Sequence, residues 1–522
     1  MKLTDLNKID AATKGSRQEL FRVGIAILFI VGIMIYLAAN PPPGGTSVLL
    51  IAAAMIGGYM ALNIGANDVA NNVGPAVGSQ AITLVGAIVI AAIFESAGAL
   101  VAGGDVVSTI KKGIIDPSQI ADTQTFIWLM MAALLAGAIW LNIATALGAP
   151  VSTTHSIVGG VLGAGIAAGG VGIANWDQMA KIAASWVISP LMGGIIAAFF
   201  LYIIKRTITY KSEPITAAKK IVPFLIMIMA MAFSTYIILK GLKKILELEF
   251  LEAGGIGLII SIVIFVLVKP MIAKAADKLP KNKDSVNHLF TIPLIFAAAL
   301  LSFAHGANDV ANAVGPLAAI NDAVISSGIS SKAHIPLWVL LVGAIGISLG
   351  LALYGPKLIK TVGTEITELN KMRAFSIAMA ASITVIIASQ LGLPVSSTHI
   401  AVGGIFGVGF LREYLKASYG ETLVEIQHHH DQDDREIVEK FLMEFKMATL
   451  ERQNEMLRDL KNHSSKANLS KKERKALGKI YRQKLVKRSH LLKIAAAWVI
   501  TVPVSGLLAA ILFFTIRGMM LP

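Results

Sequence analysis

The sequence predicts an all-helical polytopic membrane protein with two inverted-topology repeats, whose broken helices and re-entrant half-helices meet at the midplane of the bilayer. Three observations lead to this fold class: an apolar composition, many long apolar segments, and a motif that occurs twice. Hydrophobic residues make up 55% of the 522 residues and charged residues only 15%, and the mean hydropathy is +0.70. This composition excludes an ordinary soluble enzyme.

Apolar segments near the ~20 residues that span the hydrocarbon of a bilayer recur along the whole chain. They lie at about 22–39, 47–64, 82–103, 126–147, 151–169, 182–204, 221–240, 254–269, 290–305, 337–354, 374–392, 395–411 and 491–516. They predict about eleven to thirteen crossings. No small-residue cleavage pattern follows the first segment, so we interpret it as a retained helix and not as a signal peptide.

The net charge of +14 belongs to the loops. Lys and Arg gather at 2–22, 205–220, 269–283, 357–373 and 412–490. If each apolar segment crosses once, these loops share one side, and the positive-inside rule makes that side cytoplasmic. A multi-pass protein of a bacterial inner membrane is the simplest fit. The chain has no cysteine, which excludes disulfides and thiolate metal sites.

One seven-residue motif occurs twice. Gly-Ala-Asn-Asp-Val-Ala-Asn stands at 65–71 and again, 241 residues later, at 306–312. Each copy brings a carboxylate into apolar surroundings, and a charge inside a bilayer persists mainly where it meets an ion, a substrate or a partner. The two copies therefore mark a candidate binding site. Each copy is followed by a Gly-Pro pair, at 74–75 and 315–316, where we expect the helices to be broken.

The duplication extends beyond this motif. Residues 92–98 align with 344–350, residues 150–155 with 394–399, and residues 186–188 with 498–500, at offsets of 252, 244 and 312. The last offset is larger because the second half contains an insertion of about 68 residues within 412–490. Counting the crossings places the starts of the two repeats on opposite sides of the membrane. We therefore expect inverted repeats with a site at the midplane.

These boundaries divide the chain into six expected segments. They are a cytoplasmic N-terminus with an extra first transmembrane helix (1–46), transmembrane repeat 1 (47–204), a linker with a transmembrane hairpin (205–289), the first part of repeat 2 (290–411), a charged cytoplasmic insert (412–490) and the last helix of repeat 2 (491–522). Apolar residues at helical spacing predict amphipathic helices in the insert.

The segments Pro-Val-Ser-x-Thr-His at 150–155 and 394–399 predict half-helix N-termini inside the protein. Proline suits the first turn of a helix, and Ser and Thr cap its start. The free N–H groups and a partial charge of roughly +0.5 make such an end an anion site, with ordinary capping and packing as the alternative. The hydroxyl residues concerned are Ser152, Thr153, Thr154, Ser396, Ser397 and Thr398.

The duplicated motif offers hard oxygen ligands within one helical turn, a set that suits a small monovalent cation better than zinc or copper. The residues are Asn67, Asp68, Asn71, Asn308, Asp309 and Asn312. The charges of two carboxylates and a bound dianion sum to about −4, and two helix N-termini contribute only about +1. At least two monovalent cations should therefore accompany the anion. A buried structural ion pair is the alternative for the two aspartates.

Other titratable residues leave two interpretations open. Glu95 is a third intramembrane carboxylate, but its repeat partner is Ile347, so it serves either ion coupling or structure. His155 and His399 directly follow the two groups of three hydroxyl residues, and each either orients a hydroxyl or takes a polar packing role. His305 has no counterpart, because position 64 is Ile, and is expected to be local. The histidine run at 428–430 is expected to be solvated.

The duplicated Gly-Ala-Asn-Asp-x-x-Asn segment resembles the signature of the inorganic phosphate transporter (PiT) family, over about 47–411 and the last helix. The resemblance implies symport of inorganic phosphate with sodium or protons and no further cofactor. It places ions near Asn67, Asp68, Asn308 and Asp309, and phosphate at the six hydroxyl residues. It favours a transporter in contact with membrane lipid, not an enzyme and not a partner of nucleic acid, and it leaves a homo-oligomer open.

Sodium is favoured at the cation-binding residues, because amides can coordinate sodium but cannot accept a proton at neutral pH. Proton-coupled and metal-phosphate symport stay as alternatives. An intramembrane aspartyl protease is a remote one, since its two aspartates would not sit in identical motifs facing duplicated hydroxyl clusters. A passive anion channel would not need paired carboxylates, which repel an anion unless cations bind with it.

Overall fold

The computed structural model describes residues 3–42, 47–102, 106–107, 109–110, 113–241, 248–280, 283–326, 335–360, 362–363, 369–414, 443–444, 456 and 488–520. One compact unit comprises residues 1–408 and 488–522, and residues 409–487 form a second unit. The amphipathic helices expected in the insert, and the histidine run within it, lie outside the described residues.

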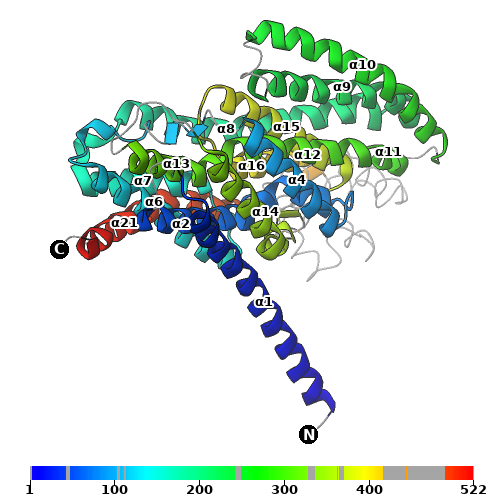
Figure 1. Cartoon of the computed structure of the whole chain (residues 1–522). Coiled ribbons are helices and arrows are strands. Elements are labelled where there is room, and N and C mark those ends of the chain that lie inside the picture. Colours follow the sequence, from blue (N-terminus) through cyan, green and yellow to red (C-terminus); the bar gives the residue numbers. More distant parts are fainter. Residues whose placement is uncertain are drawn as a thin grey trace. The chain divides into compact units, whose positions relative to one another are not determined.

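The described part of the first unit is helical, with one isolated β-bridge between Ile115 and Ala174 as its only extended pairing (Figure 1). Its helices are α1 (Leu3–Ala39), α2 (Val48–Asn67), α3 (Val69–Gly78), α4 (Leu84–Ala102), α6 (Thr123–Leu147), α7 (Thr153–Gly169), α8 (Trp176–Ile204), α9 (Pro214–Gly241), α10 (Phe250–Asp277), α11 (Lys283–Leu289), α12 (Thr291–Asp309), α13 (Ala311–Ser326), α14 (Leu337–Lys360), α15 (Lys371–Gln390), α16 (Ser397–Tyr414) and α21 (Arg488–Met520).

Within the described ranges, 11 helical segments are long and apolar enough to cross a membrane, with α2–α3 and α12–α13 each counted as one. The prediction of an all-helical polytopic membrane protein is confirmed. The 17-residue α7 and the 18-residue α16 do not belong to this set. Both start at buried residues, as the re-entrant half-helices of the prediction would.

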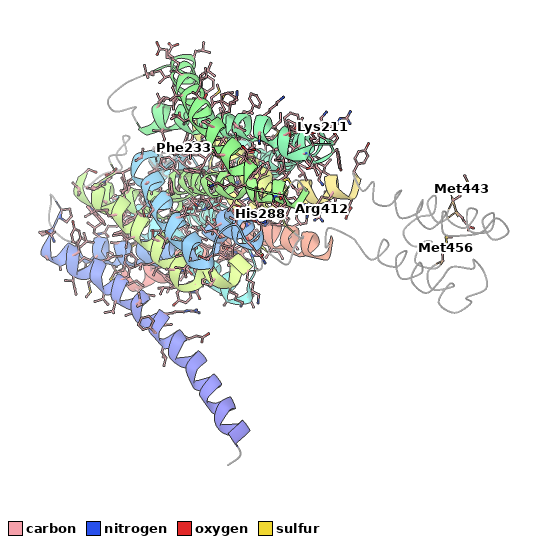
Figure 2. All side chains as sticks on the ribbon, turned by 90° about the vertical axis from the view of Figure 1, so that its right-hand side faces the viewer. Lys211, Phe233, His288, Arg412, Met443 and Met456 are labelled. Atoms are coloured by element: carbon pink, nitrogen blue, oxygen red, sulfur yellow. The ribbon has the colours of Figure 1, made fainter. Side chains whose placement is uncertain are left out.

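Of the 11 apolar segments described, the one that carries the second copy of the motif is the most enclosed. The apolar window of α12–α13 is 89% buried, whereas that of α10 is 17% buried. Helix α10 instead packs mainly on α9, and the two lie side by side at the edge of the unit in Figure 1. Phe233 of α9 contacts Phe303 of α12 edge to face, with ring centroids 5.4 Å apart (Figure 2).

Two motif glycines allow the close helix packing that positions the aspartates. A Cβ on Gly65 would lie 1.9 Å from the carbonyl oxygen of Ile347 in α14, and one on Gly306 would lie 2.2 Å from that of Glu95 in α4. No side chain fits at such distances, so α2 and α12 approach their neighbours backbone to backbone. The same contact is thus made twice, three residues before each aspartate.

The position of the helix breaks differs from the prediction, which placed them at Gly74-Pro75 and Gly315-Pro316. Helix α3 runs through Pro75 and α13 runs through Pro316. The breaks lie at Asp68 and Val310, where Asn71 N–H bonds to the Asp68 carbonyl and the chain tightens locally. Pro75 and Pro316 lie inside these helices, where each removes one backbone bond without ending the helix. The buried Asp68 carboxylate, by contrast, accepts hydrogen bonds from the starts of both α7 and α16.

Candidate functional site

Helices α7 and α16, which we call the half-helices after the prediction, start at buried residues, each with a serine as its N-cap. Ser152 Oγ accepts a hydrogen bond from His155 N–H at 3.1 Å, and Ser396 Oγ accepts one from His399 N–H at 3.2 Å. The capping predicted from sequence is present, but Pro150 and Pro394 precede the caps by two residues instead of standing in the first turn. Each cap hydroxyl keeps its own hydrogen to donate.

Asp68 joins the two half-helices. Its carboxylate accepts hydrogen bonds from Thr153 Oγ1 at the start of α7 and from Thr398 Oγ1 at the start of α16. The side chain lies at the break between α2 and α3 and is buried. One carboxylate from the first half of the chain therefore holds hydroxyls from both halves.

Asp309 occupies the equivalent place at the end of α12. Ser397 Oγ donates to its Oδ2 at 2.8 Å, as Thr153 does to Asp68. His305 Nε2 lies 2.8 Å from the same oxygen. Within the described part of the chain, Oδ1 of Asp309 is buried and has no hydrogen-bond partner.

Two amides cross between the halves in the same way. Asn71 Nδ2 donates to Thr398 Oγ1 at 2.7 Å, and Asn312 Nδ2 donates to Thr154 Oγ1 at 3.2 Å and to Thr153 Oγ1 at 3.0 Å. The side-chain oxygens of both asparagines are buried and lack a donor among the residues described. A buried oxygen without a donor is a place for a cation, because it can serve as a hard ligand.

Asn67 and Asn308 make a third pair, and their amides fasten the segments that lead into the half-helices. Asn67 Nδ2 donates to Thr145 Oγ1 at 3.0 Å and to the Ala149 carbonyl at 3.1 Å, while its Oδ1 accepts from Val151 N–H. Asn308 Nδ2 donates to Ser389 Oγ at 2.8 Å. These amides bind side-chain hydroxyls and backbone of the segments before α7 and α16, and they lie directly beside the aspartates in sequence.

The third carboxylate, Glu95, is connected to Asp309 through His305. His305 Nδ1 lies 2.6 Å from Glu95 Oε2, and Asn72 Nδ2 donates to Glu95 Oε1 at 2.8 Å. Nδ1 is hydrogen-bonded to Glu95, and Nε2 lies within ion-pair distance of Asp309, so a protonated ring would place a positive charge between the two carboxylates. The expectation that His305 is local is wrong: it stands one helical turn before Asp309, and that spacing could have revealed the contact.

One potential ligand atom each from Asp68, His305 and Asp309 lies within 4.8 Å of the others. All three side chains are buried. Two carboxylates this close repel each other in a low-dielectric interior unless positive charge is nearby. The cluster can therefore hold small cations, and the half-helix N-termini beside it can hold an oxyanion.

His155 and His399 pack against each other and against two tryptophans. Their ring centroids are 4.4 Å apart, and Trp186 and Trp498 flank them at 3.8 and 3.7 Å. Trp186 Nε1 donates to the Pro394 carbonyl at 3.2 Å. This geometry favours the packing interpretation of the two histidines, which fill the space behind the hydroxyl triplets.

Comparisons with known proteins agree with this chemistry. A model of the phosphate transporter family matches residues 64–509. A Helicobacter pylori (strain J99) protein named "Putative phosphate permease" is 52% identical over 523 residues, covering 98% of each chain. A protein of the same description from Pyrococcus furiosus is 41% identical over 365 residues, covering 70% of this chain and 88% of its own length.

A solved structure titled "The sodium-dependent phosphate transporter" superimposes with a TM-score of 0.73 and 31% identity, covering 91% of this chain and 100% of that one. The matched family consists of transporters and not of enzymes, which removes the protease alternative. With the family model spanning most of the chain and a relative sharing half of its residues, this protein belongs to the phosphate transporter family.

Proposed function

We propose that the protein imports inorganic phosphate by symport with monovalent cations, sodium being favoured, through alternating access. The observation that carries this proposal is the position of Asp68, whose carboxylate accepts from Thr153 of one half-helix and Thr398 of the other. A cation bound there would balance the carboxylate and free both hydroxyls to face an anion. Cation and phosphate would then depend on each other for binding, which is what symport requires.

Phosphate would bind between the starts of α7 and α16. Each start supplies free N–H groups and a partial charge of roughly +0.5. The hydroxyl donors are Ser152, Thr153, Thr154, Ser396, Ser397 and Thr398, all of them buried. None of the hydrogen bonds seen in this cluster, among the residues described, comes from Lys or Arg, so an anion would rely on dipoles and on accompanying cations.

The charge of the cluster supports the need for those cations. Asp68, Asp309 and Glu95 against one protonated His305 leave about −2 before any phosphate enters. Phosphate adds further negative charge. The unpartnered side-chain oxygens of Asn71 and Asn312 favour sodium over protons, because an amide coordinates sodium but is not protonated at neutral pH.

Alternating access would use the contacts that cross between the two expected repeats. The bonds Asn71 to Thr398 and Asn312 to Thr154 join the halves directly. Opening to either side would require the two half-helices to separate, so these bonds would break and re-form during the cycle. We further propose a bacterial inner membrane, with the N-terminus and the 412–490 insert in the cytoplasm.

Uptake of labelled phosphate into proteoliposomes tests the proposal. An inward sodium gradient is compared with a proton gradient at equal membrane potential, with and without a chelator of divalent ions. We expect concentrative uptake driven by sodium and unaffected by the chelator. Uptake driven only by protons would reassign coupling to the Glu95–His305 pair, and loss of uptake with the chelator would indicate a metal-phosphate complex. Absence of uptake under every gradient would overturn symport.

A further inference from the structure

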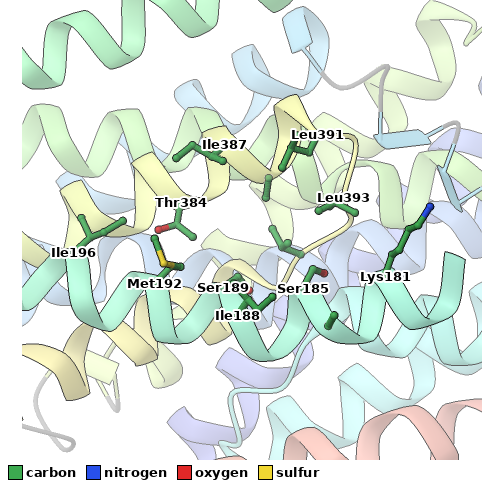
Figure 3. Close-up of a pocket in the computed structure, with 13 residues that line it drawn as sticks. Lys181, Ser185, Ile188, Ser189, Met192, Ile196, Thr384, Ile387, Leu391 and Leu393 are labelled. Atoms are coloured by element: carbon green, nitrogen blue, oxygen red, sulfur yellow. The ribbon is translucent and has the colours of Figure 1, made fainter. Parts of the chain in front are cut away.

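A mostly apolar groove of about 440 Å³ lies between α8 and α15, outside the site described above (Figure 3). Lys181 stands at one end of the groove and Ile196 at the other, and Thr384 faces Met192 between them. Ser189 lines its floor: its Oγ is buried and has no partner among the described residues. A buried hydroxyl without a partner needs an explanation, because desolvation without a hydrogen bond costs free energy.

The duplicated half of the molecule explains how the groove arises. At the repeat offsets of 244 and 312, Thr384 corresponds to Trp140 of α6, and Ser189 corresponds to Thr501 of α21. There, Trp140 Nε1 donates to Thr501 Oγ1 at 3.1 Å. The indole that fills the space and satisfies the hydroxyl in one interface is thus missing from the other, where Thr384 is too small to do either.

The ends of the groove indicate its occupant. Helix α8 has 29 residues, and at 1.5 Å per residue it is about 43 Å long, longer than the ~30 Å hydrocarbon layer. Lys181 in its second turn is exposed, and in a helix centred on the bilayer it would lie near the edge of the hydrocarbon layer, within reach of the lipid headgroups. The faces beside the groove are open and apolar, with Ile188 56% and Leu391 68% exposed. A lysine at headgroup level attracts an anionic lipid.

We propose that this groove binds one anionic glycerophospholipid. Its phosphate contacts Lys181, and one acyl chain lies between α8 and α15 toward Ile196. From Lys181 to Ile196 the helix rises about 22 Å, which accommodates most of an acyl chain. The lipid thereby supplies the apolar volume that the Trp140 indole supplies in the other half.

The bound lipid would also support the phosphate site. Leu393 and Val395 line the groove and lead directly into the N-cap Ser396 of α16. The Val395 carbonyl accepts a hydrogen bond from Thr154 Oγ1 at 2.9 Å. An empty groove leaves this segment with less packing on its outer side. This consequence rests on the proposed function, whereas lipid binding does not.

Native mass spectrometry of the purified full chain, supplied with phosphatidylglycerol or phosphatidylcholine of equal chain length, measures the binding. We expect one phosphatidylglycerol per protein and at least about fivefold less phosphatidylcholine, the factor that one lysine contact gives. Thr384→Trp, which copies Trp140, and Lys181→Glu should each lower phosphatidylglycerol retention at least about fivefold. Lys211→Ala, just beyond the opposite end of the α8 helical run (Figure 2), should leave it unchanged.

Equal retention of the two lipids, or unchanged retention in Thr384→Trp with the wild-type melting temperature, would overturn the proposal. If Thr384→Trp does not fold, Ser189→Leu fills the groove from its other wall, and the phosphatidylglycerol retention of that variant tests the proposal instead. Because this readout needs no transport, a failed sodium experiment leaves it standing, and a failed lipid experiment leaves symport standing.

Discussion

Asp68 and Asp309 stand in identical seven-residue motifs but have different partners. Asp68 accepts from a hydroxyl of its own half, Thr153, and from one of the other half, Thr398. Among the residues that the structure describes, Asp309 accepts from Ser397 of its own half and lies 2.8 Å from His305. The first carboxylate bridges the two halves, and the second lies beside a histidine that would balance it when protonated.

The difference arises from three positions at which the halves diverge. Where the second half has His305, the first has Ile64; where the first has Asn72 and Glu95, the second has Ala313 and Ile347. In space, His305, Glu95 and Asn72 form one chain of contacts that ends on Asp309. A duplicated framework thus carries one asymmetric charge cluster, and the two aspartates are not interchangeable.

Removal of either aspartate charge is expected to have the largest effect. Asp68→Asn or Asp309→Asn should abolish coupled phosphate uptake, because each loses a carboxylate that accepts from hydroxyls and that we propose binds a cation, while folding and membrane insertion persist. Proteoliposome uptake and size-exclusion profiles measure this. Asp116→Asn, on an exposed loop, is the matched control. Near-normal transport in either site variant would remove that aspartate from the mechanism.

His305→Ile should destabilise the fold by about 3–5 kcal/mol, because Glu95 and Asp309 are left buried without their positive partner. The double variant with Glu95→Ile copies the residues of the opposite halves, Ile64 and Ile347, and should recover most of that loss. Thermal unfolding in detergent of the two single variants and the double variant gives the coupling energy between His305 and Glu95. Strictly additive effects would show that the cluster is not energetically coupled.

Loss of single hydroxyls is expected to act on phosphate more than on cations. Ser152, Thr153, Ser396 and Ser397 changed singly to Ala should weaken phosphate binding about tenfold each, the value of one hydrogen bond to a charged group. Equilibrium binding of phosphate and of sodium separates the two effects. Ser376→Ala, a buried serine bonded only within its helix, is the control. Unchanged phosphate affinity in all four would exclude them from the site.

The smallest expected effect concerns hydrogen bonds that are equivalent in the two halves. Thr145→Val removes the acceptor of Asn67, and Ser389→Ala removes that of Asn308. Each loses one neutral hydrogen bond and should lower the free energy of unfolding by about 1 kcal/mol. Urea unfolding of the two variants should give equal values. Clearly unequal losses would mean that the asymmetry extends into the supporting contacts.

Much of the site could be predicted from residue types and their spacing. The buried hydroxyl triplets, their serine caps and the convergence of both aspartates were predictable, because a repeated polar motif in apolar helices can be satisfied only by the same kinds of neighbours. The location of the helix breaks was not. Pro75 and Pro316 are the stronger local signals, yet tertiary hydrogen bonds to Asp68 place the break there instead.

By itself, the sequence determined the membrane class, the number of long helices, the duplication and the candidate ligands, since these depend on composition, length and periodicity. Only the tertiary structure decided which residues that differ between the halves act together. His305 and Glu95 are 210 residues apart, and nothing local links them until α4 packs on α12. The groove beside α8 has the same origin, because a missing indole becomes visible only where its packed counterpart, Trp140, can be compared with it.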